Sequence, residues 1–472
     1  MNYPYFLTDN LDIDLSYRLA VSTLAANTLP FKDGILENEE PVFIAGLRYY
    51  SPWTRDAAIN TWNGGGLVAP DVALNTLKSV MGKDENGYFI DGEYWDRIIW
   101  TIGAWWYYIY TGDREFLKMA FEAVTNSLVH FEATEFDESL NLFRGAACYG
   151  DGVAAYPDIY AQHGRSGIIS FSRENRDLCE SVGVGIPMFA LSTNCLYYYA
   201  YVLADRMACE LGKPEAYAEK AKKMKEAINR VFWNDEKGNY RYIHDKFGGC
   251  DSLEGLGLCF AVLFGVADKE QTEKVFENTT ITKQGIACVY PSFSRYDTPD
   301  GMGFGRHSGT VWPHVQGFWA DAAAQNRKRD IFDFEFQKQT EHTIKFDQFS
   351  EIYHPITGDI YGGRQEDRKN GIREWDSVPT QTWSATAYLR QVYFDIMGMK
   401  FDIDGIRFDP ICTRLIKKAE LKCLTYRNST LNIKLSGEGE RIVAFRLNGK
   451  ETEPFISCDI TGENNIEIII GD

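Results

Sequence analysis

The sequence predicts a mainly α-helical fold, a two-layer toroid of helical hairpins over residues 1–401 followed by a small β-sandwich over residues 402–472. Three observations favour this fold. Several helical segments are apolar on almost every face but too short to cross a membrane, so they belong inside a large helical assembly. Other segments are amphipathic and suit an outer layer. After about Asp402 the pattern changes to short alternating strands.

The helices are expected, in chain order, at residues 71–81, 94–110, 114–130, 191–211, 214–232, 254–264, 311–324 and 380–396. The runs DRIIWTIGAWWYYIY and TNCLYYYAYVLA leave no room for a solvent-facing stripe and predict inner helices. PEAYAEKAKKMKEAINRVFW has one apolar face and predicts an outer helix. In the tail, LNIKLS, RIVAFRLNGKE and NNIEIIIG alternate as strands, with Asn448-Gly449 placed for a tight hairpin turn. We expect this tail to stabilise the helical part.

Composition limits the partners. A formal net charge of −18 argues against nucleic acid and anionic membranes, which need a positive surface, and fits a neutral substrate. The ten cysteines form no CxxC pair, which favours free thiols in a reducing compartment. We therefore expect a cytoplasmic protein, with secretion as the alternative if a signal peptide was removed. No HExxH, Walker or dinucleotide-type motif is present, so no metal or cofactor is expected. A homo-oligomer is left open.

The segment YYSPWTRDAAINTWNGGG, residues 49–66, places Arg55 and Asp56 beside Trp53 and ahead of a glycine run. Guanidinium donors next to a carboxylate can hold two neighbouring sugar hydroxyls between them. The alternative is a structural Arg–Asp ion pair at the start of a helix.

The segment GAACYGDGVAAYPDIYA, residues 145–161, places Asp151 between two glycines in an aromatic loop. Such a loop can present a carboxyl into a cleft, where partial burial would raise its pKa towards that of a general acid. Asp151 is therefore the candidate acid, and Asp158 and Glu180 are its rivals. The structural alternative is a turn aspartate that bonds its own backbone.

Residues 296–319 place His307 and Trp312 on either side of a Ser-Gly turn, just before a helix that starts near Pro313. This loop can aim an imidazole and an indole at a sugar. The alternative is a surface histidine.

Glu351 lies in SEIYHPITGDIYGG, and QTWSATAYL, with Trp383, follows it. A carboxylate in a loop rich in glycine, proline and aromatic residues, next to a tryptophan, suits a site that cleaves sugars. The alternative is a glutamate that only caps a structural loop or forms a salt bridge within it. Between the two segments, GGRQEDRKNGIREWDSVP inserts a charged loop with Arg364 and Gln365, which we expect to shape the acceptor side of the site.

These motifs resemble those of the six-hairpin (α/α) barrel glycoside hydrolases. WTRDAA resembles the segment with which glucoamylases grip the terminal glucose. The pattern E-x-Y-x-P-x-T-G ahead of Trp-Ser-Ala resembles that of the processing α-glucosidases and their bacterial relatives, in which the glutamate is the general base. The loop aspartate ahead of a Tyr-Pro pair, and the loop before Trp312, are similar to segments of the bacterial members.

The resemblance covers about residues 45–397 and implies an exo-acting, inverting glycoside hydrolase. It would release a terminal sugar, α-linked glucose or a related hexose, from an oligosaccharide or glycoside. Asp151 would protonate the leaving oxygen and Glu351 would deprotonate the attacking water, with Trp53, Trp312 and Trp383 as walls. Inversion requires the two carboxyl groups to lie about 6.5–9.5 Å apart.

Two other functions remain open on the same scaffold. A disaccharide phosphorylase would need a phosphate pocket near Glu351, for which Arg364, Arg368 and Arg373 are available. A non-catalytic carbohydrate-binding protein would keep the cleft without the chemistry.

Overall fold

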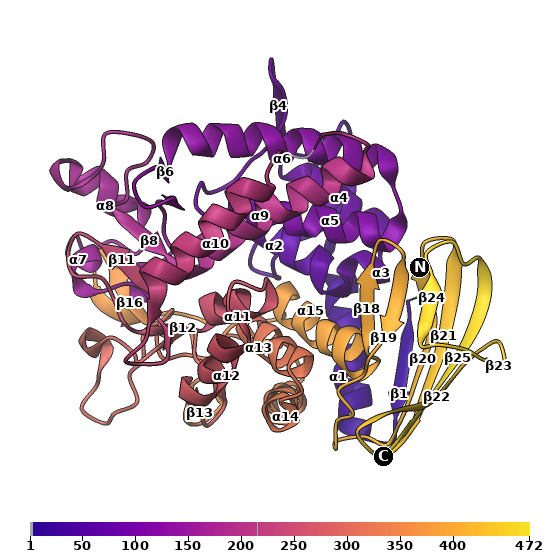
Figure 1. Ribbon diagram of the computed structural model, residues 1–472. Coiled ribbons are helices and arrows are strands. Elements are labelled where there is room, and N and C mark those ends of the chain that lie inside the picture. The colour runs from indigo at the N-terminus through magenta and orange to yellow at the C-terminus, as the bar shows by residue number, and fades with distance from the viewer. Residues whose placement is uncertain (1–2, 215) are drawn as a thin grey trace.

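The computed structural model describes residues 3–214 and 216–472, and it is mainly helical with a sheet region at one side (Figure 1). The helices of the body form an inner and an outer layer. Outer and inner helices alternate along the chain, beginning with the outer helix Leu11–Ala26 and ending with the inner helix Thr382–Arg390. This arrangement is consistent with the predicted toroid of helical hairpins.

The inner helices contact one another in a closed ring, in the order α2, α5, α9, α11, α13, α15 and back to α2. Their bounds are α2 (Thr54–Asn60), α5 (Trp100–Thr111), α9 (Leu191–Glu210), α11 (Gly255–Leu263), α13 (Pro313–Gln325) and α15 (Thr382–Arg390). In α5 only Trp106 and Thr111 are not fully buried, and in residues 193–204 of α9 only Tyr198, Tyr199 and Val202 are not. The segments that are apolar all round are therefore interior, as predicted.

The outer layer consists of α1 (Leu11–Ala26), α4 (Pro70–Ser79), α6 (Arg114–Thr134), α10 (Ala218–Phe232), α12 (Lys269–Asn278) and α14 (Arg329–Phe346). Helix α10 buries Ala221, Met224, Ala227, Ile228 and Phe232, which share one helical face, so its predicted amphipathic character is confirmed. Outer helix α12 packs on inner helix α13 through Phe276 and Trp319, whose ring centres are 4.9 Å apart.

The sequence predicted most of these helices but not all. Helices α1, α2, α12 and α14 were not expected, and the segment 380–396 ends its α-helix at Arg390 and continues as a π-helical turn over Gln391–Ile396. The helix expected at 214–232 begins at Ala218, and residue 215 of that range lies outside the described residues.

The C-terminal strands form two sheets. The larger sheet has the order β1-β20-β21-β25-β22-β23, in which β21 and β25 are parallel, and the smaller one has the order β18-β19-β24. Their bounds are β1 (Tyr5–Thr8), β18 (Met399–Asp402), β19 (Gly405–Phe408), β20 (Lys418–Tyr426), β21 (Ser429–Gly437), β22 (Arg441–Leu447), β23 (Lys450–Glu451), β24 (Phe455–Ser457) and β25 (Gly462–Gly471). Strand β1 brings the start of the chain into this sheet, which sequence reasoning did not anticipate.

The Asn448-Gly449 turn joins β22 to β23, and both residues have positive φ, 51° and 78°. This is the turn geometry that matches the twist of a hairpin, so the predicted tight turn is confirmed. The sheets contact the helical body through Phe401, whose ring lies 5.2 Å from that of Tyr110 on α5.

The remaining elements are short and lie mostly in the loops. The short helices are α3 (Gly66–Val68), α7 (Asp158–Ala161) and α8 (Ile169–Glu174). The short strands are β2 (Thr28–Phe31), β3 (Glu40–Phe43), β4 (Met81–Asp84), β5 (Gly87–Ile90), β6 (Phe136–Asp137), β7 (Leu142–Phe143), β8 (Met188–Ala190), β9 (Trp233–Asn234), β10 (Asn239–Tyr240), β11 (Ile243–Asp245), β12 (Leu253–Glu254), β13 (Ile281–Thr282), β14 (Gly285–Ile286), β15 (Val289–Tyr290), β16 (Arg364–Asp367) and β17 (Gly371–Glu374).

All ten cysteines lie within the described residues and are free thiols, as expected. Among those same residues, no helix is long and apolar enough to cross a membrane. Residues 3–214 and 216–472 also contain no group of three or more His, Cys, Asp or Glu side chains placed to hold a metal ion.

Candidate active site

A cavity of about 260 Å³ opens at the N-terminal ends of three inner helices, α2, α13 and α15. It brings together nearly all of the residues that the sequence singled out: Trp53, Arg55, Asp56, Asp151, His307, Trp312, Glu351, Gln365 and Trp383. Because these positions are spread over more than 300 residues of the chain, the ring of inner helices is what gathers them.

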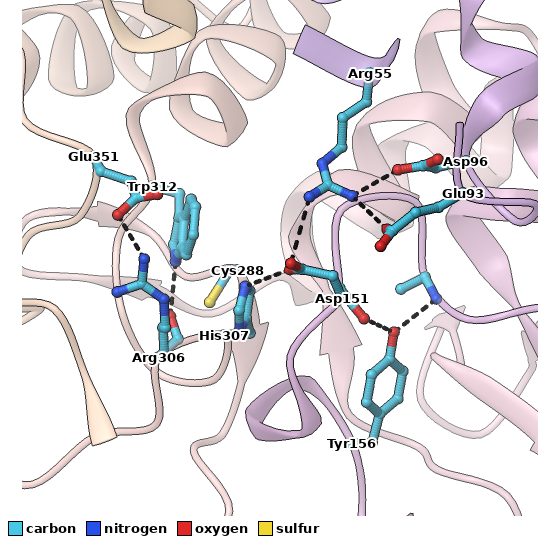
Figure 2. Close-up of polar contacts among 12 residues, drawn as sticks. Arg55, Glu93, Asp96, Asp151, Tyr156, Cys288, Arg306, His307, Trp312 and Glu351 are labelled. Atoms are coloured by element: carbon cyan, nitrogen blue, oxygen red, sulfur yellow. Dashed lines mark hydrogen bonds and ion pairs between the residues drawn. The ribbon is translucent and has the colours of Figure 1, made fainter. Parts of the chain in front are cut away.

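Arg55, in the first turn of α2, is held in a fork of carboxylates (Figure 2). Its Nη1 lies 2.6 Å from Oδ2 of Asp96 and 3.2 Å from Oε2 of Glu93, while its Nη2 lies 3.6 Å from Oδ2 of Asp151. Asp96 and Glu93 come from the loop just before the 3₁₀ turn at Arg97–Ile99. Arg55 is thus fixed from one side and faces Asp151 on the other.

Asp56, the next residue, is buried at the cavity wall, and its Oδ1 has no hydrogen-bond partner. Burial raises the pKa of Asp56 to about 7, although the charge of Arg55 opposes the rise. An unpartnered acceptor at the wall of a cavity is suited to bind a hydroxyl group of a ligand. The local ion pair with Arg55, which was the structural alternative, is not formed by a direct contact, since the partners of Arg55 are Asp96, Glu93 and Asp151.

Asp151 follows β7 in a loop fixed by backbone bonds, and about half of its side chain, 48%, is exposed to the cavity. Its neighbour Gly152 cannot be replaced without a clash, because a Cβ there would lie 2.1 Å from Oε1 of Gln365. Burial alone would raise the pKa of Asp151, but the charge of the Arg55 guanidinium more than offsets it and holds the pKa below its usual value. The raised pKa that we expected from the sequence is therefore wrong for the free protein.

His307 lies between the two carboxylates of the site. Its Nε2 is 3.5 Å from Oδ1 of Asp151, and its ring stacks on Trp312 with centres 5.0 Å apart. Burial lowers the pKa of His307 to about 3, so the imidazole is neutral near pH 7. The histidine is 3% exposed, so the alternative of a surface residue is excluded.

Glu351 is held by three donors. Arg306 Nη2 donates to Oε2 over 2.6 Å, the Val378 amide donates to the same oxygen over 3.2 Å, and the Tyr49 hydroxyl donates to Oε1 over 3.0 Å. The carboxylate is 2% exposed and lines the cavity. In Figure 2 the Arg306–Glu351 pair and the Arg55–Asp151 pair lie on either side of His307.

The aromatic walls differ in exposure. Trp312 and Trp383 are buried, and the Trp383 ring stacks on His314 with centres 4.2 Å apart. The indole Nε1 of Trp383 is a buried donor without a partner. Trp53 is 46% exposed, so it stands at the mouth of the cavity.

The charged insertion folds as the hairpin β16–β17 and reaches the cavity through Gln365 and the following Trp375. Arg364 does not line the cavity, because its side chain donates to the carbonyls of Tyr296 and Asp297. The rival acids are also outside the lining. Asp158 accepts from Arg295 with 71% of its side chain exposed, and Glu180 is exposed.

Sequence reasoning missed five residues that build the site: Tyr49, Glu93, Asp96, Arg306 and Trp375. Two of them had a visible signal, since Arg306 precedes His307 and Tyr49 lies just ahead of the WTRDAA segment. Glu93 and Asp96 gave no signal, because their role depends on Arg55, about 40 residues away along the chain.

The arrangement provides two carboxyl groups, each beside its own arginine, at one small cavity with aromatic walls. Such a pair can divide the roles of acid and base between them, because the environment of each is different.

The family model of the mannosylglycerate hydrolase MGH1-like glycoside hydrolase domain matches residues 99–384, which is more than half of the chain. No curated protein matches the chain.

Several solved structures are similar. A sialidase has a TM-score of 0.68 at 15% identity, over 95% of this chain and 40% of the sialidase. A GH78 family rhamnosidase of a Bacillus species has a TM-score of 0.58 at 15% identity, over 100% of this chain and 44% of the rhamnosidase. A GH63 mannosylglycerate hydrolase from Thermus thermophilus, solved with glucose, has a TM-score of 0.59 at 13% identity, over 80% of this chain and 99% of the hydrolase. The chain therefore spans less than half the length of the first two, and identities this low show a shared fold alone.

Proposed function

The chain belongs to the mannosylglycerate hydrolase MGH1-like glycoside hydrolase family, and on this basis we propose that it is an exo-acting, inverting glycosidase. Membership confirms the class of enzyme that the motifs predicted. The sugar released is, in our proposal, a terminal α-linked glucose or a related hexose. The observation that carries the proposal is that Asp151 and Glu351 line one small cavity, each beside a different arginine.

In the proposed reaction Asp151 protonates the glycosidic oxygen while Glu351 takes a proton from the water that attacks the opposite face of the sugar. Three donors fix the Glu351 carboxylate, so it can present a lone pair without reorienting. The two carboxyl groups then need a separation of about 6.5–9.5 Å to leave room for the water.

The lowered pKa of Asp151 has to be overcome before it can act as an acid. The charge of the Arg55 guanidinium lowers it in the free protein. A bound sugar could accept hydrogen bonds from the Arg55 guanidinium through its hydroxyl groups and displace water from the loop. Both effects would weaken the stabilisation of the Asp151 carboxylate and raise the pKa of Asp151. Substrate binding would thus supply the proton-donating form of the acid.

Exo action follows from the size of the site. Cavities for drug-sized ligands measure about 300–1,000 Å³, so a cavity of about 260 Å³ suits one sugar ring and a small part of the leaving group. A longer chain would extend past Trp53 at the mouth.

We further infer that the ring of inner helices is a six-hairpin (α/α) barrel and that the C-terminal sheets pack as a β-sandwich domain, with a division near residue 402. The closed order of helix contacts supports the barrel. Phe408 of the smaller sheet and Phe445 of the larger one, with ring centres 5.2 Å apart, support the sandwich. Free thiols throughout fit a cytoplasmic location.

The test is a panel of aryl glycosides, α- and β-linked gluco, manno, galacto, rhamno and glucurono, on the wild type, Asp151→Asn and Glu351→Gln. Proton NMR of the first-formed anomer reads the stereochemistry. Hydrolysis with inversion that both variants abolish supports the proposal. Retention of configuration, or no turnover of any member, contradicts it.

A further inference from the structure

The charge of the cavity lining bears on the class of substrate. The lining residues, all of which belong to the described part of the chain, include two cations, Arg55 and Arg306, and four carboxyl groups, Asp56, Glu93, Asp151 and Glu351. Asp96, just behind the wall, adds a further carboxyl group 2.6 Å from Arg55.

Both cations of the lining are already paired with carboxylates of the protein. Arg55 already contacts Asp96 and Glu93. Arg306 donates to Glu351 and, over 2.9 Å each, to the carbonyls of Gly362 and Asp376. A carboxylate entering the cavity would therefore compete with protein carboxylates that already neutralise both guanidinium groups, whereas a neutral hydroxyl group would not.

The arginines next to the lining residues are engaged in the same way. Arg48, which precedes Tyr49, lies 3.2 Å from Asp376. Arg373, which stacks on Trp375, lies 3.2 Å from Asp367. An anion at the mouth would compete with the carboxylate that is already paired with each of these arginines.

We propose that the cavity selects glycosides without a negative charge and rejects anionic sugars and anionic leaving groups. The rejected leaving groups include glycerate, the carboxylate that appears in the name of the family. A carboxylate entering the site would lose its hydration and meet an excess of like charge. The inference rests on the proposed glycosidase function and narrows its substrates to neutral ones.

The test compares two aryl glycosides of the sugar that the enzyme hydrolyses, one with a 4-carboxylatophenyl leaving group and the other with its methyl ester. The expected result is a kcat/KM at least tenfold lower for the carboxylate. Equal values, or a preference for the carboxylate, would overturn the inference while leaving the glycosidase function intact.

A variant tests the cause. Glu93→Gln removes one negative charge from the lining, and it is expected to narrow the difference between ester and carboxylate several-fold. The matched control is Glu277→Gln, an exposed glutamate on outer helix α12, which should leave the ratio unchanged. If Glu93→Gln leaves the ratio of kcat/KM for the ester to kcat/KM for the carboxylate unchanged, the charge of the lining does not select the substrate.

A binding measurement separates this inference from the function itself. Calorimetric titration of the wild type with glucose and with glucuronate requires no turnover. Weaker binding of glucuronate by tenfold or more supports the charge selection even if every aryl glycoside is inert, and equal binding overturns it.

Discussion

Arg306 Nη2 lies 2.6 Å from Glu351 Oε2, and at most a tenth of either side chain is exposed. The pair therefore joins two loops, before α13 and before α15, at the wall of the cavity. A buried carboxylate that lost this partner would be left with an uncompensated charge.

Arg306→Met is expected to lower the free energy of unfolding by about 3–5 kcal/mol, since it leaves Glu351 buried and unpaired. Urea denaturation measures the change. In the Glu351→Gln background the same substitution should cost much less, because the charge is gone. The exposed pair Arg407–Asp404 serves as a control, and Arg407→Met should leave the free energy of unfolding nearly unchanged. Equal losses in both backgrounds of Arg306→Met would show that the two residues are not coupled.

Asp151 and Glu351 should be essential for catalysis, and the rival acids Asp158 and Glu180 should not. We expect Asp151→Asn and Glu351→Gln each to lower kcat by about 10²–10⁴-fold, the range for a general acid or base. Asp158→Asn and Glu180→Gln should retain most of the wild-type kcat, because both residues lie outside the lining. Steady-state measurement of kcat for all four variants on the best aryl glycoside tests this prediction. Loss of activity in either rival variant would transfer the role of acid to that residue.

The pH profile should report the influence of Arg55 on Asp151. A general acid works in its protonated form, so kcat/KM falls as pH rises through its pKa in the free enzyme. Arg55 lowers the pKa of Asp151, and Arg55→Met removes that charge. The alkaline limb of the kcat/KM profile should therefore move to higher pH in the variant, whatever the change in KM. A limb that stays in place would assign the acid elsewhere, with Asp56, whose pKa is raised to about 7, as the next candidate.

The sequence predicted the positions of the site better than its electrostatics. Trp312 and Trp383 could be placed because each stands at the start of a helix that the sequence predicted, which is a local pattern. The pKa of Asp151 could not be predicted, since it depends on Arg55, which lies in a different hairpin almost a hundred residues earlier. Arg306 was missed for the same reason, because its partner Glu351 becomes a neighbour only when the loops before α13 and α15 meet.

Stability should fall as pH rises from about 5 to 8. Burial raises the pKa of Glu335 to about 8 and that of Glu254 to about 7, whereas an unfolded glutamate titrates near 4.3. Between these values the folded state binds more protons than the unfolded state, so the free energy of unfolding decreases with pH, by about 1.4 kcal/mol per pH unit for each such group. Glu335→Gln should flatten the slope by that amount between about pH 5 and 7.5, although it lowers stability overall. Urea denaturation across this range measures it, with Glu277→Gln as the control that keeps the wild-type slope.

Phosphate should not take part in the reaction. A phosphorylase on this scaffold would need cations near Glu351, and the insertion was the expected source. Arg364 is instead bound to the carbonyls of Tyr296 and Asp297, and Arg373 is paired with Asp367. A phosphate dianion would also have to enter a lining in which carboxyl groups outnumber cations. We therefore expect equal turnover in phosphate and in a zwitterionic buffer of the same ionic strength, with free sugar as the product in both. Sugar phosphate detected by phosphorus NMR, together with faster turnover in phosphate, would replace hydrolysis by phosphorolysis.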